Sequence, residues 1–467
     1  MSIKDSKILL NKANDLKIDS FSVENLTNAS IVITTLDEKL VIDPWFEDGI
    51  YDGTWHNFPR LNETQKEEAL SGVDICMYTH LHKDHFCIAT AKKYFSPSTK
   101  FLIPKVFGWQ VIQSVLNKNG FPLTHVLECS KDVFHTENFQ IRAVPPLNVT
   151  GLEASTLNDL SIDGGFCLVH KRSGVKAVFL ADDNLYSEMR INENIELLKD
   201  PDLIAFAYSG FASDYPFKFN FSNNEMVAIC NEQEEKRFTT QVRNLQEINP
   251  KCVMPYSSEF VAVGSHAKKW LEILGEVWTS NKTLVTSKYA SKLGVDGVSV
   301  YPGDYIVFDG NGNRTDRINS LLNDGQYSYE SLLDYASQYV EEVEQPEKIT
   351  PDASDAQSSI ADKLKLASKN YKFALEKHEL SPKQNLIICI NEKYFFKIDI
   401  KGNLEDGNSQ EVLKPFLRLD VDYQLMQRLL EGEKHWDDAC LSLKLSWQRV
   451  PNIFCSDTLN ALNYLKI

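Results

Sequence analysis

Four side chains that can bind a metal ion lie within the six-residue run HLHKDH at residues 80–85. The run holds three of the ten histidines of the chain, and it follows the β-rich segment VDICMYT and leads into a helix-like one. Alternate residues of a strand end point the same way, so His80 and His82 can converge on one ion, while Asp84 and His85 approach from the start of the helix. Imidazole and carboxylate groups hold a divalent ion and leave a position open. An isolated histidine is usually a structural group, but four such residues in this order predict metal ligands.

A metal ion held by this run could support two kinds of reaction. A bound water molecule with its pKa lowered to about 7 supplies hydroxide, which attacks a phosphoryl or acyl centre. Asp84 would then bind a second ion or act as the base that orients this water. Hydrolysis is the first interpretation; an oxidative enzyme with iron is the second, and a metal-binding scaffold without turnover is the third. The expected cofactor is zinc or iron, as one or two ions.

The composition describes an acidic globular protein. Lys and Arg total 49 against 65 Asp and Glu, a net charge of -16, which argues against a nucleic-acid or anionic-membrane surface and favours a small-molecule substrate. The nine cysteines have no paired spacing and an odd total, which indicates reduced thiols. The N-terminal residues lack the apolar core of a signal peptide, and no apolar run approaches about 18 residues. We therefore expect a cytoplasmic protein, with a homo-oligomer left open.

The elements that must position the run alternate between strand and helix. Residues 31–35 and 39–42 predict a hairpin, and short apolar strands separated by helical segments continue to about residue 320. This rhythm indicates mixed α/β layers. Residues 339–359 are acidic and proline-containing, as in a linker. We expect a metal-binding domain at 1–338 and a small α+β domain at 360–467.

The motif H-x-H-x-D-H, together with Asp43 in LVIDP, resembles the metallo-β-lactamase superfamily. The resemblance implies an αββα sandwich and a metal-bridging aspartate at the end of a later strand. FLADD supplies Asp182 at that place, with Asp183 as the neighbouring choice.

Two further histidines that the superfamily usually has are replaced here. The corresponding segments are AVPPLNVTG, which offers Asn148, and VMPYSSEF, which offers Tyr256 and Ser257. His266 in VGSHAKKW could replace the last ligand or be an ordinary exposed residue. His56, in an aromatic loop after Asp43, could line the substrate mouth or make only a loop contact. Asn148, Tyr256, His266 and His56 are thus the candidate substrate-binding residues, whereas His170 is expected at the far end of its strand.

Longer segments resemble the CMP-N-acetylneuraminic acid hydroxylase family. They are DPWFEDG, THLHKDH, YSGFASDYPFKF, MPYSSEFVAVGSH and RLLEGEKHWDDACL. The resemblance suggests a nucleotide-sugar or related phosphodiester substrate. That family carries a Rieske domain, which needs C-x-H and C-x-x-H pairs, and this chain has no C-x-H. Its one C-x-x-H, Cys167 to His170, is interpreted as coincidence, so hydroxylation would require a separate electron-transfer partner.

The C-terminal segment has aromatic and aliphatic residues at spacings suited to a small core. His435 and Trp436 therefore need not touch substrate. The alternatives are that this domain closes over the active site or mediates dimerisation.

Overall fold

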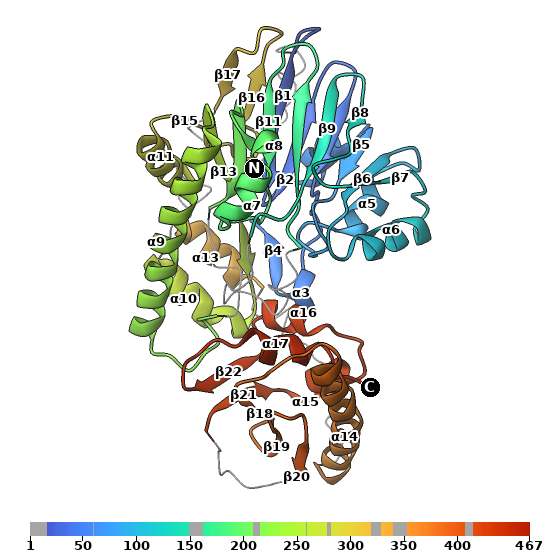
Figure 1. The fold of residues 1–467 in the computed structure, drawn as a ribbon, viewed down its shortest axis with the longest axis vertical. Coiled ribbons are helices and arrows are strands. Elements are labelled where there is room, and N and C mark those ends of the chain that lie inside the picture. Colours follow the sequence, from blue (N-terminus) through green and yellow to red (C-terminus); the bar gives the residue numbers. More distant parts are fainter. Residues whose placement is uncertain are drawn as a thin grey trace.

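The structure is a computed structural model that describes residues 16–58, 60–148, 162–208, 215–257, 259–277, 282–318, 328–339, 353–406 and 414–467. Two large sheets face each other in the upper part of Figure 1, with helices on both outer faces, and a smaller sheet with its own helices lies below them. Among the described helices, none has the length and hydropathy needed to cross a bilayer.

The first sheet carries the strand that leads into the HLHKDH run. Its strand order is β17-β16-β1-β2-β3-β5-β6-β7. The antiparallel β2–β3 pair is the hairpin expected from the sequence, and β3, β5, β6 and β7 are parallel, joined by helices. The strands are β1 (Phe21–Thr27), β2 (Ser30–Thr34), β3 (Lys39–Ile42), β5 (Ile75–Met77), β6 (Lys100–Pro104), β7 (Thr124–Leu127), β16 (Tyr305–Phe308) and β17 (Arg314–Arg317). The helices are α4 (Glu63–Leu70), α5 (Ile88–Tyr94) and α6 (Trp109–Lys118).

The second sheet has the order β15-β13-β12-β11-β10-β9-β8. Strands β11, β12, β13 and β15 are parallel, so β11, β12 and β13 end at one edge of the sheet. The strands are β8 (Phe134–His135), β9 (Phe139–Val144), β10 (Gly165–His170), β11 (Lys176–Phe179), β12 (Leu203–Ala207), β13 (Cys252–Tyr256) and β15 (Asp296–Gly297). The helices are α7 (Glu188–Glu193), α8 (Ile195–Leu198), α9 (Asn223–Ile248) and α11 (Lys282–Leu293).

The central strands of both large sheets are buried on both faces, which explains their near-continuous apolar sequences. Ile31 and Ile33 of β2 lie in the core between the sheets, with Phe166 and Leu168 of β10. The residue between the two isoleucines, Val32, faces the other way and packs in the core under α4, α5 and α6. A corresponding core covers the outer face of the second sheet beneath α7, α8, α9 and α11. The expected αββα sandwich is therefore confirmed.

A smaller α+β unit, here called the C-terminal module (residues 353–467), has a separate core, which Tyr215 and Phe219 from outside the module complete. Its sheet has the order β20-β19-β18-β21-β22. Its helix α14 begins at Ala353, within the range expected to be linker, and residues 340–352 lie outside the described residues. The elements are α14 (Ala353–Lys377), β18 (Asn385–Ile390), β19 (Tyr394–Ile398), β20 (Leu404–Asp406), β21 (Phe416–Val421), α15 (Tyr423–Leu430), α16 (Trp436–Leu441), β22 (Ser446–Val450) and α17 (Ser456–Leu462).

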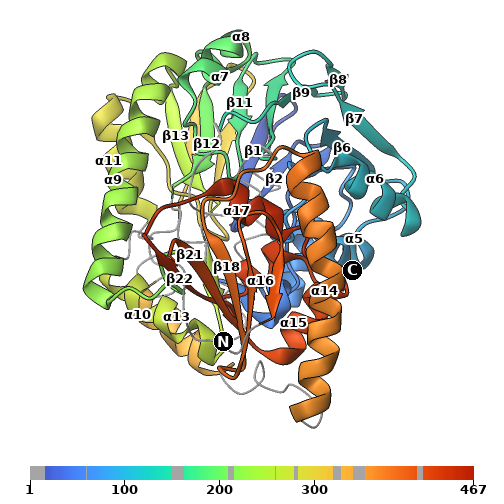
Figure 2. The same ribbon diagram turned by 60° about the horizontal axis from the view of Figure 1, so that its bottom comes forward.

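Short elements join the sandwich to the C-terminal module. They are α3 (Ile50–Gly53), β4 (Trp55–Asn57), β14 (Phe260–Ala262), the 3-10 turn Ser265–Ala267, α10 (Lys268–Val277) and α13 (Tyr329–Ser337). Figure 1 shows α16 directly beneath α3, and Figure 2 brings the face of the C-terminal module forward.

Candidate metal centre

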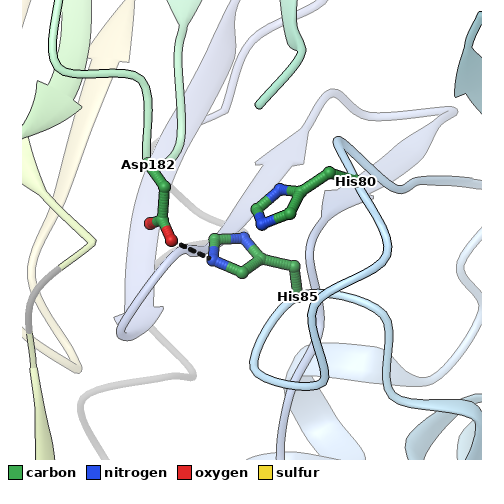
Figure 3. Close-up of side chains that lie close together, drawn as sticks. All are labelled: His80, His85 and Asp182. Atoms are coloured by element: carbon green, nitrogen blue, oxygen red, sulfur yellow. Dashed lines mark ion pairs between the residues drawn. The ribbon is translucent and has the colours of Figure 1, made fainter. Parts of the chain in front are cut away.

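The HLHKDH run forms the loop between β5 and α5, at the end of the first sheet where its parallel strands finish. His80 and His85 are fully buried, and their ring centroids lie 4.1 Å apart. Asp182 follows β11 of the second sheet and points at His85, as Figure 3 shows. The centre therefore lies between the sheets, with groups from both.

One group of donor atoms surrounds His80. Its Nε2 lies 2.9 Å from Nδ1 of His82 and 3.8 Å from Oδ1 of Asp163. Asp163 was not among the residues expected from the sequence. Gly164 explains its approach: a Cβ there would lie 3.0 Å from the carbonyl oxygen of Thr79, so only glycine lets this backbone come so close. The sequence feature that could have indicated Asp163 is the DGG turn at residues 163–165, which leads into β10.

A second group surrounds Nε2 of His85. It lies 3.1 Å from Oδ2 of Asp182 and 3.3 Å from Oδ2 of Asp84. Ser257, which follows β13, donates a hydrogen bond of 2.5 Å from its hydroxyl to Oδ1 of Asp182. Thus Ser257 orients Asp182, with Oδ2 left facing His85.

Asp43 fixes the orientation of the histidine rings from behind. It is fully buried at the end of β3 and accepts hydrogen bonds from the amide of Thr79 at 2.8 Å, from the Thr79 hydroxyl at 2.6 Å and from Nδ1 of His85 at 2.9 Å. Because the Thr79 hydroxyl donates to Asp43, it can only accept from Nδ1 of His80, 3.0 Å away. Both rings then carry their proton on Nδ1 and present a lone pair on Nε2, the arrangement that a buried carboxylate imposes on metal-binding histidines.

Asp84 is held by two further residues. Tyr51 donates to its Oδ1 at 2.7 Å, and the Asn28 amide donates to its Oδ2 at 3.3 Å. Burial and then the charge of Asp84 raise the pKa of Tyr51 well above its usual value, so the phenol stays a neutral donor. Although burial opposes ionisation of Asp84, the neighbouring His85 and these hydrogen bonds lower its pKa below the usual range. Asp84 is therefore an ionised carboxylate suited to binding a cation, and a weak proton acceptor.

The donor atoms fit metal ions. Two donors bound about 2.1 Å from one ion lie roughly 3.0–3.4 Å apart. The spacings around His85 and the His80–His82 spacing are close to this range, and Asp163 lies farther from His80, at 3.8 Å. Nε2 of His85 is buried and has no well-formed hydrogen bond to any described residue. Burial lowers the pKa of His85, but three neighbouring carboxylates, that of Asp182 foremost, outweigh burial and raise it above its usual value. A cation is thus favoured beside this nitrogen, as a proton or as a metal ion.

The other residues expected at the site are distributed as follows. Asn148 donates to Asp163 at 3.2 Å, so it supports a candidate ligand. Tyr256 is fully buried and accepts from the amide of Ala181 at 2.7 Å, beside Asp182. Asp183 turns away, because its carboxylate accepts from backbone amides of neighbouring loops.

His56 and His266 lie outside both donor groups. His56 is mostly buried and bonds through Nδ1 to the Tyr335 hydroxyl at 2.9 Å. His266 bonds through Nε2 to the Thr54 hydroxyl at 2.8 Å, near the C-terminal module. Burial lowers the pKa of His266 to about 3, so it is a neutral structural group. His170 packs against Phe21 and Phe139 at the other end of β10, as expected.

Comparison with known proteins gives distant likenesses. No family model matches the chain. The inactive cytidine monophosphate-N-acetylneuraminic acid hydroxylase of Homo sapiens is 20% identical over 252 residues, covering 53% of this chain and 46% of that protein. The corresponding hydroxylase of Pan troglodytes is 20% identical over 53% of this chain and 40% of that protein. The chain thus spans less than half the length of these relatives.

Solved structures are also similar at low identity. A metallo hydrolase from Ignicoccus hospitalis is 13% identical, with a TM-score of 0.40, covering 62% of this chain and 99% of that one. CmlA, a diiron β-hydroxylase from Streptomyces venezuelae, is 12% identical, with a TM-score of 0.40, and the match covers 62% of this chain and 54% of CmlA. The resemblance to the CMP-N-acetylneuraminic acid hydroxylases that the sequence segments indicated is confirmed at this low level of identity.

Proposed function

We propose that this chain is a dinuclear metal enzyme that uses iron to oxidise a small polar substrate. The observation that carries the proposal is the carboxylate of Asp163, which lies 3.8 Å from Nε2 of His80 and accepts from Asn148, the residue offered where the superfamily usually has a further histidine. In this proposal His80, His82 and Asp163 hold one ion, and His85, Asp84 and Asp182 hold the other.

The balance of donor charge favours iron. Three carboxylates and three imidazoles around two divalent ions leave a net charge of only about +1. Each carboxylate reduces the positive charge that acidifies bound water, and it stabilises the higher oxidation state of a redox metal. Two imidazoles with one carboxylate are also the ligand set of non-haem iron oxygenases. Hydrolysis, the first interpretation of the sequence, therefore becomes the second candidate.

The proposed reaction is a hydroxylation. When bound, iron would supply the activation of dioxygen. One oxygen atom enters a C–H bond of the substrate and the other leaves as water, which consumes two electrons and two protons. The 467 residues contain no C-x-H pair for a Rieske cluster, so in this proposal a reductase supplies the electrons. The name of the Pan troglodytes relative gives its substrate as an acidic sugar activated with cytidine monophosphate. We propose a substrate of that class for this chain.

Hydrolysis keeps specific support. The same donors accept zinc, and the 4.1 Å between the rings of His80 and His85 brings the two donor groups close enough for ions to share a water molecule. Asp84 would then bind the second ion, since its lowered pKa makes it a poor base.

Metal loading separates the two candidates. Metal-free protein is reconstituted with Fe(II) or with Zn(II) and given a nucleotide-activated sugar, with a chemical reductant and dioxygen for the iron form. We expect substrate-dependent dioxygen consumption by the iron form, and loss of it in Asp163→His, which restores an imidazole. Asp202→Asn, which changes a surface carboxylate bonded to Lys251, is the control. Turnover by the zinc form alone, without dioxygen, would establish hydrolysis instead.

A further inference from the structure

The C-terminal module reaches the metal centre through the short turn α3. Tyr51 of this turn is buried, donates to Oδ1 of Asp84 at 2.7 Å, and accepts from the amide of Lys83 at 3.2 Å. A single phenol is therefore fixed to two residues of the HLHKDH run. Its position decides where the carboxylate of Asp84 points.

The backbone that carries Tyr51 is in an unfavourable conformation. Tyr51 and Asp52 have φ values of 49° and 64°, in the left-handed region that residues with a side chain seldom occupy. Two such residues in succession persist only when their surroundings hold them. The flanking Gly49 and Gly53 also have positive φ, and there glycine makes the turn possible.

Asp52 fixes this turn through ion pairs, and the cations in these ion pairs all belong to the C-terminal module. Its carboxylate lies 2.5 Å from Nζ of Lys434, 3.1 Å from Nζ of Lys444 and 3.6 Å from the guanidinium of Arg428. Lys444 also donates to the Asp52 carbonyl at 2.8 Å. Burial opposes ionisation of Asp52, but the two lysines outweigh it and lower its pKa to about 2. Three cations thus converge on one carboxylate next to Tyr51.

Other bonds fasten the same two surfaces. They are Thr54 Oγ1 to the Ser442 carbonyl at 2.9 Å, Trp55 Nε1 to the Leu441 carbonyl at 2.8 Å, and Lys83 Nζ to Asp438 at 2.7 Å. The last of these begins inside the HLHKDH run itself. The contact is therefore continuous from α16 to the metal-binding loop.

We propose that the C-terminal module is a positioning element of the metal centre: Lys434 and Lys444 hold Asp52, and Asp52 fixes the turn from which Tyr51 aims Asp84. This inference rests on the proposed function in one respect, since it requires Asp84 to bind a metal ion. It differs from a lid or a dimerisation role, because it acts on the affinity of one ion and needs neither closure nor a second copy.

Stepwise metal affinities test the inference in the full-length chain. Tyr51→Phe removes the bond to Asp84 and keeps the ring, and Lys434→Met removes one cation. Each variant is expected to weaken binding of the ion held by His85, Asp84 and Asp182 about 10- to 100-fold, the usual effect of losing a supporting contact. Affinity for the ion held by His80, His82 and Asp163 should be unchanged. The matched control is Lys363→Met, which breaks the ion pair with Glu431 inside the C-terminal module and should change neither affinity. Cobalt(II) titration against a chelator gives both constants and a spectrum for each position.

The double variant tests whether Lys434 acts on the metal centre through Tyr51. If Lys434 acts through Tyr51, then Tyr51→Phe combined with Lys434→Met should cost no more affinity than Tyr51→Phe alone. Additive losses, equal weakening of both ions, or no effect of Lys434→Met would each overturn the inference while leaving the proposed function intact. A wild-type protein that binds no ion would overturn the proposed function, and this inference with it.

Discussion

Replacing Asp43 by asparagine should weaken metal binding without removing a ligand. The Asp43 carboxylate accepts from Nδ1 of His85 at 2.9 Å and from Thr79 at two points, and it is fully buried. An asparagine of the same shape keeps one oxygen but turns an amide group toward at least one of these donors. In either orientation of the amide, Nδ1 of His85 loses the charged acceptor that holds its proton, because the asparagine side chain is neutral.

The size of the effect follows from that bond. A hydrogen bond to a charged group contributes about 1.5–3 kcal/mol, which corresponds to roughly 10- to 150-fold in affinity. Loss of a supporting partner typically costs about 10- to 100-fold in metal affinity, so the two estimates agree. We expect Asp43→Asn to bind its metal about 10- to 100-fold more weakly, with the stoichiometry unchanged.

Competition with a chelator measures this affinity, and circular dichroism checks that the variant is folded. Asp202→Asn is the matched control, because Asp202 also adjoins a strand of the sandwich and its carboxylate also accepts from a backbone amide, that of Lys176 at 2.8 Å, but it lies outside the centre. Wild-type affinity in a folded Asp43→Asn protein would refute the reasoning that this carboxylate sets the tautomer of His85.

Four further outcomes are expected. Asp163→Asn should lower the number of bound ions from two to one, measured by elemental analysis after gel filtration. Acidification should weaken metal binding, because the raised pKa of His85 lets a proton compete with the metal ion for Nε2. Below that pKa the metal affinity falls about tenfold per pH unit, and calorimetry in two buffers would detect the proton that metal binding releases. In the metal-free protein the sign is opposite, because the stability due to protonated His85 is present at low pH and lost as the pH rises through its folded pKa. Chelation should lower the thermal midpoint for a different reason, because metal at 100 times its Kd stabilises the folded chain by about 2.7 kcal/mol. His266→Gln should leave metal affinity unchanged, because Nε2 of His266 bonds to Thr54, and a large loss would show that it is a ligand after all.

Local sequence was sufficient for the parts of the fold that depend on alternation and spacing. The β2–β3 hairpin and the layered sandwich follow from apolar strands separated by helical segments, and the HLHKDH run identifies its own loop. The carboxylate of Asp182 faces His85 and that of Asp183 accepts backbone amides, and the assignment of Asp182 as a metal ligand stays a prediction.

The rest depends on contacts between distant segments, which spacing does not encode. Asp163 is an ordinary acidic residue of a turn until Gly164 brings it against Thr79. Tyr51 and Asp52 acquire their roles from partners such as Lys444, hundreds of residues away. His266 has the residue type of a ligand, but the fold places it against Thr54.

Because the donor groups come from both sheets, an ion can be captured only after the two halves of the sandwich have closed on each other. His85 follows a strand of the first sheet and Asp182 a strand of the second, and their side chains meet across the interior. A metal ion in the proposed centre would therefore find its complete set of ligands only late in folding. Newly made chains should then pass through a closed state without metal, and metal supply would govern how many of them mature.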